Sequence, residues 1–210
     1  MTTIDLPTAS ACTIESATPE DIPAMIAMLS RGMRDNPLHV AAFGTDPDIR
    51  ERKLLQLFKL LAKNPALVAN AKVARDANGA IVGAYSFADP GTCQPSGIPK
   101  LLMAPMLMTL GFGNGRRVRS WLSAWSSHDS HERHYHFGPV GVDAHLQGQG
   151  IGSAMMHTFC TQMDDANENA YLETDKEINV GFYERFGFQV IGTDTVIGVQ
   201  NWFMLRKPAP

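Results

Sequence analysis

Apolar residues recur along the chain at two spacings, and each spacing predicts one kind of element. Residues three and four positions apart form one face of a helix, whereas short runs of β-branched and small apolar residues that end at a turn signal form strands. The clearest turn signal, at 76–79, separates two such runs and predicts a hairpin. In the first half the pattern predicts a strand at 13–17, helices at 19–33 and 47–63, and hairpin strands at 67–75 and 80–87.

The second half alternates between strands and helices, which predicts an α/β layout in a single domain over residues 12–210. Pro and Gly interrupt residues 89–133, where a short helical pattern covers 116–125, and we expect an insertion that covers a pocket. Residues 1–11 are expected to form a flexible tail. After the insertion the pattern predicts a strand at 134–142, a loop and helix at 147–163, a strand at 170–174, a helix at 178–186, and strands at 189–194 and 201–206.

The composition narrows the class of protein. With 210 residues and 44% hydrophobic content the chain can bury a substantial core, while a net charge of −3 with scattered Lys and Arg provides no basic field for a nucleic acid. Cys12, Cys93 and Cys160 lie far apart and are odd in number, which favours reduced thiols and a cytoplasmic location. The most apolar stretch, at 101–112, is too short to cross a bilayer and contains Pro105, so we expect no membrane segment.

A glycine-rich loop between an apolar strand and an apolar helix predicts a phosphate site. Glycines let backbone N–H groups approach a ligand closely, and the helix that follows directs its unpaired N–H groups and the positive end of its dipole at the loop. Side-chain amides and a hydroxyl at the helix start add further donors. The loop consists of Gln147, Gly148, Gln149, Gly150, Ile151, Gly152 and Ser153.

Two other phosphate-binding motifs were compared with this loop. A Walker loop requires a lysine after its last glycine, and none is present here. The dinucleotide fingerprint GxGxxG fits at Gly148 and Gly150, with Glu173 placed to contact a ribose, but its third glycine falls on Ser153. This fingerprint usually opens a long series of strand–helix units, whereas only one further strand and helix follow here. Nicotinamide binding is therefore kept as an alternative that ranks below the two functions named at the end of this subsection.

The loop resembles the acyl-CoA signature (Q/R)xxGxG of the GNAT N-acetyltransferases, which it matches at Gln147, Gly150 and Gly152. A second match is the segment 179–188, Asn-Val-Gly-Phe-Tyr-Glu-Arg-Phe-Gly-Phe, which is similar to the family's Asn…Phe-Tyr…Gly-Phe helix and turn. The two motifs occur in the family's order. Residues 134–207 resemble the puromycin acetyltransferase-like branch in particular.

The resemblance implies an α/β (α+β) fold: a mixed, strongly twisted sheet of six to seven strands flanked by helices, with strands four and five splayed apart. The implied cofactor is acetyl-CoA. Its pantetheine arm would pair with the backbone of Val140, Gly141 and Val142, and its pyrophosphate would bind at the loop 147–153. Asn179 would lie near the cofactor chain.

Direct transfer of acetyl from the thioester to an amine needs an acid, a base and a group that stabilises the oxyanion. Tyr183 can protonate the departing thiolate, although a tyrosine simply packed on the sheet would fit the same pattern. The backbone N–H of Val140 follows a proline and is the candidate for the oxyanion. His134, His136, Glu173 and a water chain among them remain alternatives for the base.

Four histidines lie between 128 and 136, but their spacing matches no zinc signature and no cysteine is close to them in sequence. We therefore expect a surface cluster and no metal. The function we expect is acetyl transfer to an amine of a small molecule or a peptide, by a monomer or homodimer. The alternative is a catalytically silent acyl-CoA-binding regulatory module.

Overall fold

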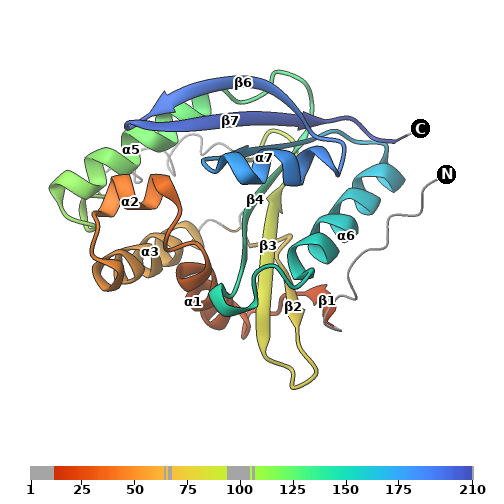
Figure 1. Cartoon of the computed structure of the whole chain (residues 1–210), viewed down its shortest axis with the longest axis horizontal. Coiled ribbons are helices and arrows are strands. Elements are labelled where there is room, and N and C mark those ends of the chain that lie inside the picture. Colours follow the sequence, from red (N-terminus) through yellow and green to blue (C-terminus); the bar gives the residue numbers. More distant parts are fainter. Residues whose placement is uncertain (1–11, 64, 66–67, 94–104, 106, 210) are drawn as a thin grey trace.

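The computed structural model of the chain describes residues 12–63, 65, 68–93, 105 and 107–209 (Figure 1). A seven-stranded sheet with the order β1-β2-β3-β4-β5-β7-β6 forms its frame. Neighbouring strands run antiparallel except β4 and β5, which are parallel. The strands are β1 (Thr13–Ser16), β2 (Lys72–Arg75), β3 (Ile81–Ala88), β4 (Tyr135–Val142), β5 (Ala170–Thr174), β6 (Gln189–Val196) and β7 (Val199–Arg206).

The two parallel strands separate soon after they meet. They pair only at Tyr135 with Ala170 and at His136 with Tyr171. Beyond His136, β4 continues beside β3 as far as Val142, and β5 continues beside β7. The predicted mixed sheet with splayed fourth and fifth strands is therefore confirmed.

Helices cover both faces of this sheet. One group packs over a core cluster that contains Val73 and Ala84, and the other packs over Tyr85, Phe137 and other residues of the opposite face. Figure 1 shows α1, α2, α3 and α5 gathered on the side opposite α6. The first group is α1 (Ile22–Gly32), α2 (Pro37–Phe43), α3 (Pro47–Leu61) and α5 (Phe112–Ser127), and the second is α6 (Ile151–Ala166) and α7 (Glu177–Glu184).

A bulge in β4 lies where the sheet begins to open. Tyr85 pairs with Val140 and Phe87 pairs with Phe137. Between these pairs, one residue of β3 therefore lies opposite two residues of β4. The extra residue falls at Gly138-Pro139, and a proline cannot donate to the ladder. The bulge therefore falls where one residue is a glycine and the next cannot pair through its nitrogen.

Close approach of α1 fixes the far end of β4. A Cβ on Gly32 would lie 2.3 Å from the carbonyl oxygen of Val142, and one on Gly141 would lie 3.0 Å from the Leu29 side chain. The last turn of α1 therefore touches the β4 backbone directly, because only hydrogens separate the two segments at Gly32. This contact holds the end of β4, from which the glycine-rich loop departs.

The sequence pattern misjudged three local features. It treated Asn36-Pro37 as a break, whereas Pro37 is the first residue of α2 and Asn36 is its extended N-cap, an arrangement that the fixed φ of proline favours. Helix α5 extends well beyond the predicted 116–125. Strand β2 begins at Lys72 rather than 67, and residues 68–70 form a turn. The tail predicted at 1–11 lies outside the described residues.

Candidate active site

The glycine-rich loop ends in a helix start with unpaired backbone donors. Gly148 and Gly150 have φ values of +80° and +85°, in the left-handed region that glycine adopts without steric cost. The first intrahelical bond of α6 joins the Ala154 N–H to the Gly150 carbonyl at 2.9 Å. The N–H groups of residues 151–153 therefore precede any helical acceptor, and no described side chain caps them. Unpaired N–H groups at a helix start are suited to binding an anion, and the sequence predicts such a site at this loop.

Gln147 holds the loop in place. Its side-chain amide donates to the carbonyl oxygens of Gly32 at 3.1 Å and Val142 at 3.2 Å, so it links α1 to the end of β4. The Gln149 amide lies 3.4 Å from the His145 carbonyl oxygen. Both glutamines were expected to offer donors to a phosphate, but here their amides point to backbone carbonyls. The backbone N–H groups of residues 151–153 thus remain as donors at the helix start.

An ion pair that sequence reasoning missed lies beside the loop. Arg31 Nη2 is 2.9 Å from Asp143 Oδ2, and His145 Nε2 is 3.0 Å from Asp143 Oδ1. The Arg31 side chain is 42% exposed, so its charge is accessible to a ligand at the helix start. No local sequence signal could have identified Arg31, because 112 residues separate it from Asp143.

One edge of β4 is open at the place where the pantetheine arm was expected. Val140, Gly141 and Val142 pair with β3 on one side. On the other side no described strand pairs with them, since β5 has already diverged. Apart from the Val142 carbonyl, which accepts from Gln147, main-chain groups on this edge can pair with an extended ligand that adds to the sheet like a strand.

Tyr183 lies in α7 with 6% of its surface exposed. Its ring packs near those of Phe182 and Phe188, at centroid distances of 5.3 and 6.0 Å. Burial, with a smaller contribution from the Asp175 carboxylate, raises the pKa of the phenol, so the hydroxyl keeps its proton at neutral pH. No described residue hydrogen-bonds this hydroxyl.

Helix α7 is close to the loop on the same face of the sheet. A Cβ added to Gly152 would lie 3.8 Å from Cζ of Phe182, the residue next to Tyr183. Asn179, one turn earlier, donates to the Thr174 hydroxyl at 3.2 Å, which holds it at the end of β5. The two motifs found in the sequence therefore meet in space.

The three candidates for the base also lie together. His136 Nε2 is 2.9 Å from Glu173 Oε2, and the His134 and His136 rings both contact Tyr171, at centroid distances of 5.0 and 5.2 Å. Burial alone would lower the pKa of each histidine, but nearby groups raise it: Glu173 and Cys93 bring the pKa of His136 to about 10, and Asp129 and Cys93 bring that of His134 to about 9. A protonated imidazole cannot accept a proton, so Glu173 fits the role better.

The candidate acid and base lie on opposite faces of the sheet. Successive residues of a strand point to opposite sides. Leu172 belongs to the core cluster that contains Tyr183, whereas Tyr171 packs on the other face with Phe203. Glu173 shares the face of Tyr171, and the gap between β4 and β5 separates it from α7.

The expectation about the histidines needs a correction. His134 is 6% exposed and is therefore not a surface residue. His128 does not face it but stacks on Phe203 with ring centroids 4.3 Å apart. Cys93, which is remote in sequence, lies beside the pair His134 and His136 at the start of β4.

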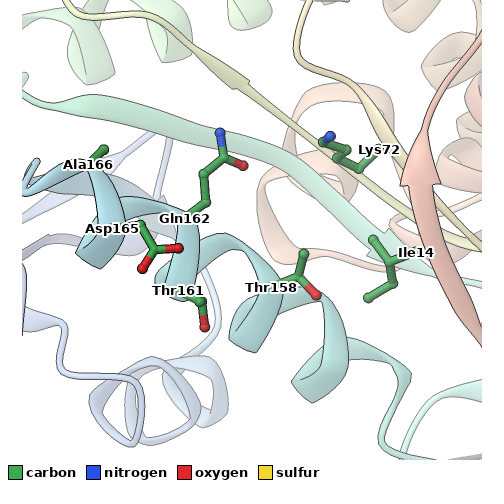
Figure 2. A pocket seen from close by; sticks show the side chains of 7 residues that line it. All are labelled: Ile14, Lys72, Thr158, Thr161, Gln162, Asp165 and Ala166. Carbon is green, nitrogen blue, oxygen red and sulfur yellow. The ribbon is translucent and has the colours of Figure 1, made fainter.

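A hollow of about 480 Å³ lies elsewhere, between α6 and the strands β1 and β2. Figure 2 shows Thr158, Thr161, Gln162 and Asp165 of α6 on one side of it and Lys72 and Ile14 on the other. None of these residues belongs to the predicted site, and the hollow is widely open, so we assign it no role. Among the described residues, no helix is long and apolar enough to span a bilayer.

Residues 114–190 match the family model of the acetyltransferase (GNAT) domain. Over 70 residues the chain is 34% identical to a mycothiol acetyltransferase of Mycolicibacterium vanbaalenii. The match covers 30% of this chain and 23% of that enzyme, so it spans less than a quarter of the relative.

Solved structures match almost the whole chain. A protein from Corynebacterium glutamicum, described as histone acetyltransferase HPA2 and related acetyltransferase, has a TM-score of 0.71 at 23% identity, covering 95% of this chain and 98% of its own. A Brucella melitensis GNAT acetyltransferase in complex with acetyl-CoA has a TM-score of 0.52 at 17% identity, with coverages of 96% and 90%. A Drosophila melanogaster polyamine N-acetyltransferase that forms N-acetylagmatine has a TM-score of 0.64 at 16% identity, with coverages of 94% and 100%.

The predicted cofactor, acetyl-CoA, is the one that GNAT acetyltransferases use, and a similar structure contains it. The predicted resemblance to this family is confirmed, while the puromycin acetyltransferase-like branch stays a prediction. The chain therefore has the GNAT fold and contains, at residues 114–190, a GNAT acetyltransferase domain match.

Proposed function

We propose that the chain is an acetyl-CoA-dependent N-acetyltransferase that moves an acetyl group directly to an amine. One observation carries the proposal: the open edge of β4 leads to a helix start with three unpaired N–H groups. The open strand edge suits the extended thioester arm of acetyl-CoA, and the helix start suits its diphosphate. The two features lie in the order that the cofactor requires.

In this proposal acetyl-CoA binds through the backbone. The pantetheine arm pairs with Val140, Gly141 and Val142, and the diphosphate accepts hydrogen bonds from the N–H groups of residues 151–153. Arg31 adds a positive charge nearby, and Asn179 meets the cofactor chain at the end of β5. The thioester then reaches the gap between β4 and β5, between the faces that carry Glu173 and Tyr183.

The reaction forms one bond and breaks one. The amine nitrogen attacks the thioester carbonyl, and Glu173 takes the proton that the nitrogen releases, directly or through a water. The Val140 N–H stabilises the negative charge on the carbonyl oxygen. When the C–S bond breaks, Tyr183 donates its proton to the thiolate, so free CoA and an amide leave the site. No covalent enzyme intermediate is needed.

We propose a small-molecule amine as the acceptor, with a peptide amine as the alternative that the same experiment examines. The Drosophila relative in fold acetylates agmatine, which supports this choice. A buried carboxylate at Glu173 also attracts a cationic amine into the gap. The resemblance of residues 134–207 to the puromycin acetyltransferase-like branch adds aminonucleosides to the acceptors to be examined.

The protein is best placed in the cytoplasm as one domain over residues 12–210, either monomeric or dimeric. Cys12, Cys93 and Cys160 are all free thiols, which agrees with a reducing compartment. All seven strands belong to a single sheet, which supports one domain.

The experiment is to follow release of CoA thiol from acetyl-CoA in the presence of agmatine, spermidine, an arylalkylamine, puromycin and a peptide with a free N-terminus. Thiol release that depends on one class of amine, with the acetylated product identified by mass spectrometry, supports the proposal. Tight acetyl-CoA binding by calorimetry without thiol release for any amine would identify a silent acyl-CoA-binding module. Absence of binding would remove the cofactor assignment as well.

A further inference from the structure

Four metal-ligating side chains converge at the start of β4. Cys93 lies after β3, Asp129 lies just after α5, and His134 and His136 stand two residues apart where β4 begins. One ligand atom from each of the four lies within 4.8 Å of all the others. Three separate segments therefore contribute to one group.

The spacing of these atoms is that of a small coordination sphere. A tetrahedral zinc ion with bonds of about 2.0–2.3 Å separates its ligand atoms by roughly 3.3–3.8 Å. Here Cys93 Sγ is 3.3 Å from Asp129 Oδ2, while His134 Nε2 and His136 Nδ1 are 3.1 and 4.0 Å from Asp129 Oδ1. Small side-chain adjustments would bring all four ligands around one ion.

Each histidine is oriented by a second acceptor on its outer nitrogen. His134 Nδ1 lies 2.7 Å from the Glu132 carbonyl oxygen, and His136 Nε2 lies 2.9 Å from Glu173 Oε2. The outer nitrogen of each ring is the one that faces this acceptor, and the inner nitrogen is the one that faces the cluster. In a neutral ring, a proton on the outer nitrogen leaves a lone pair on the inner nitrogen. Metal-binding histidines almost always have such a carbonyl or carboxylate partner.

The inner atoms lack hydrogen-bond partners although they are buried. His134 Nε2, His136 Nδ1 and Asp129 Oδ1 are all enclosed, and no described group forms a well-aligned hydrogen bond with them. If both rings are neutral, as metal binding requires, two nitrogen lone pairs and a carboxylate oxygen face and repel each other, and leaving these buried groups unpaired costs free energy. A cation at the centre removes both problems.

We propose that Cys93, Asp129, His134 and His136 bind one zinc ion through Sγ, a carboxylate oxygen, Nε2 and Nδ1. Thiolate, imidazole and carboxylate together suit zinc better than magnesium or calcium, which prefer oxygen alone. Four protein ligands leave no open position, so the ion is structural.

The proposed ion joins both ends of the insertion at 89–133 to the sheet. Cys93 stands near its beginning and Asp129 near its end, and His136 is the last residue at which β4 pairs with β5. The ion also fixes His136 as a donor to Glu173, and it removes both histidines from the list of possible bases. The proposal does not depend on acetyl transfer.

The experiment uses the full chain with any histidine tag removed. Metal content is measured by mass spectrometry after expression with zinc, and the metal-free protein, prepared with a chelator, is titrated with Co²⁺. Tetrahedral cobalt gives strong visible absorption, and a thiolate ligand adds a charge-transfer band in the near ultraviolet. We expect about one equivalent of zinc per chain and a cobalt spectrum of this kind that zinc abolishes.

Cys93→Ser and Cys12→Ser form the matched pair of variants. Cys93→Ser should lose the charge-transfer band, and Cys12→Ser should retain it because Cys12 lies outside the cluster. Circular dichroism checks the fold of each. If Cys93→Ser fails to fold, alkylation of the wild type decides: zinc should slow modification of Cys93 but not of Cys12.

Three results would overturn the proposal. The first is purified protein that contains no stoichiometric metal and also gives no tetrahedral cobalt spectrum. The second is a charge-transfer band that persists in Cys93→Ser. The third is a Cys93 alkylation rate that zinc does not change. The last result would point to a reactive thiolate held by histidines instead.

Discussion

His136 donates from Nε2 to Glu173 Oε2 across 2.9 Å, at the last register position where β4 and β5 pair. This contact occupies one carboxylate oxygen. The other, Oε1, is buried and has no partner among the described residues. The carboxylate is therefore held in one orientation with one oxygen able to accept a proton.

Glu173→Gln should lower kcat for acetyl transfer at neutral pH by about 10²- to 10⁴-fold, because an amide cannot act as the general base. The deficit should shrink as the pH rises and more of the amine is unprotonated before it binds. Steady-state thiol release from pH 6 to 10 measures this.

Glu20→Gln is the control, since Glu20 is exposed in the turn before α1. A deficit in Glu173→Gln that stays constant over the whole pH range would assign Glu173 to positioning only.

Tyr183→Phe should reduce kcat by about 10²- to 10⁴-fold while the Kd for acetyl-CoA stays nearly constant, because the substitution removes only the proton that the thiolate needs. Thiol release and calorimetry measure the two quantities. Unchanged turnover would return Tyr183 to a packing role.

Tyr85→Phe is the matched control for Tyr183. Tyr85 is fully buried, and burial raises the pKa of its hydroxyl to about 12. No described residue hydrogen-bonds that hydroxyl, so its removal should leave kcat unchanged and keep or increase the free energy of unfolding. A loss of turnover in both variants would indicate a general effect of altering the core.

Gly152→Ala should raise the Kd for acetyl-CoA by about tenfold or more, because a methyl group at the helix start obstructs the phosphate and the loss of one charged hydrogen bond has this size. The fold should not suffer, since the nearest atom to the new Cβ is 3.8 Å away. Calorimetry and thermal unfolding measure the two effects.

Gly113→Ala is the matched control, because Gly113 is also the second residue of a helix, α5, that follows a glycine N-cap. We expect unchanged acetyl-CoA binding there. Equal Kd values for the two variants would contradict a diphosphate site at α6.

Asp164→Asn should make stability less dependent on pH. The hydrogen bond from Arg206, at 2.7 Å, lowers the pKa of Asp164 below its ordinary value of 3.8 despite partial burial. Because the folded-state pKa is the lower one, the stabilisation is present above about pH 3.8 and is lost as the pH falls through the folded-state pKa.

At pH 7 Asp164→Asn should reduce the free energy of unfolding by about 1.5–3 kcal/mol, the usual value of a hydrogen bond to a charged group. Near pH 2 the difference from wild type should be small. Urea unfolding at both pH values measures this, with the exposed neighbour Asp165 changed to Asn as the control. An equal difference at the two pH values would show that the Asp164 contribution is not electrostatic.

Local sequence patterns were sufficient to predict most elements and the backbone geometry of the glycine-rich loop. Strand β5 begins and ends where its apolar run does, and β4 starts one residue from its predicted position. The loop could be predicted because Gly148 and Gly150 need left-handed backbone and because a helix start directs its N–H groups at the loop. The errors were local too: Pro37 can end one element or begin the next, and only packing decides which.

The amino-acid sequence by itself determined those features that depend on neighbours along the chain, namely helical faces, strand runs, turns and the glycine loop. Only the tertiary structure decided which distant groups meet: Arg31 with Asp143, His136 with Glu173, and Cys93 with His134. The physical reason is that side-chain spacing within an element follows from backbone geometry, whereas a contact between residues on different elements depends on how those elements pack.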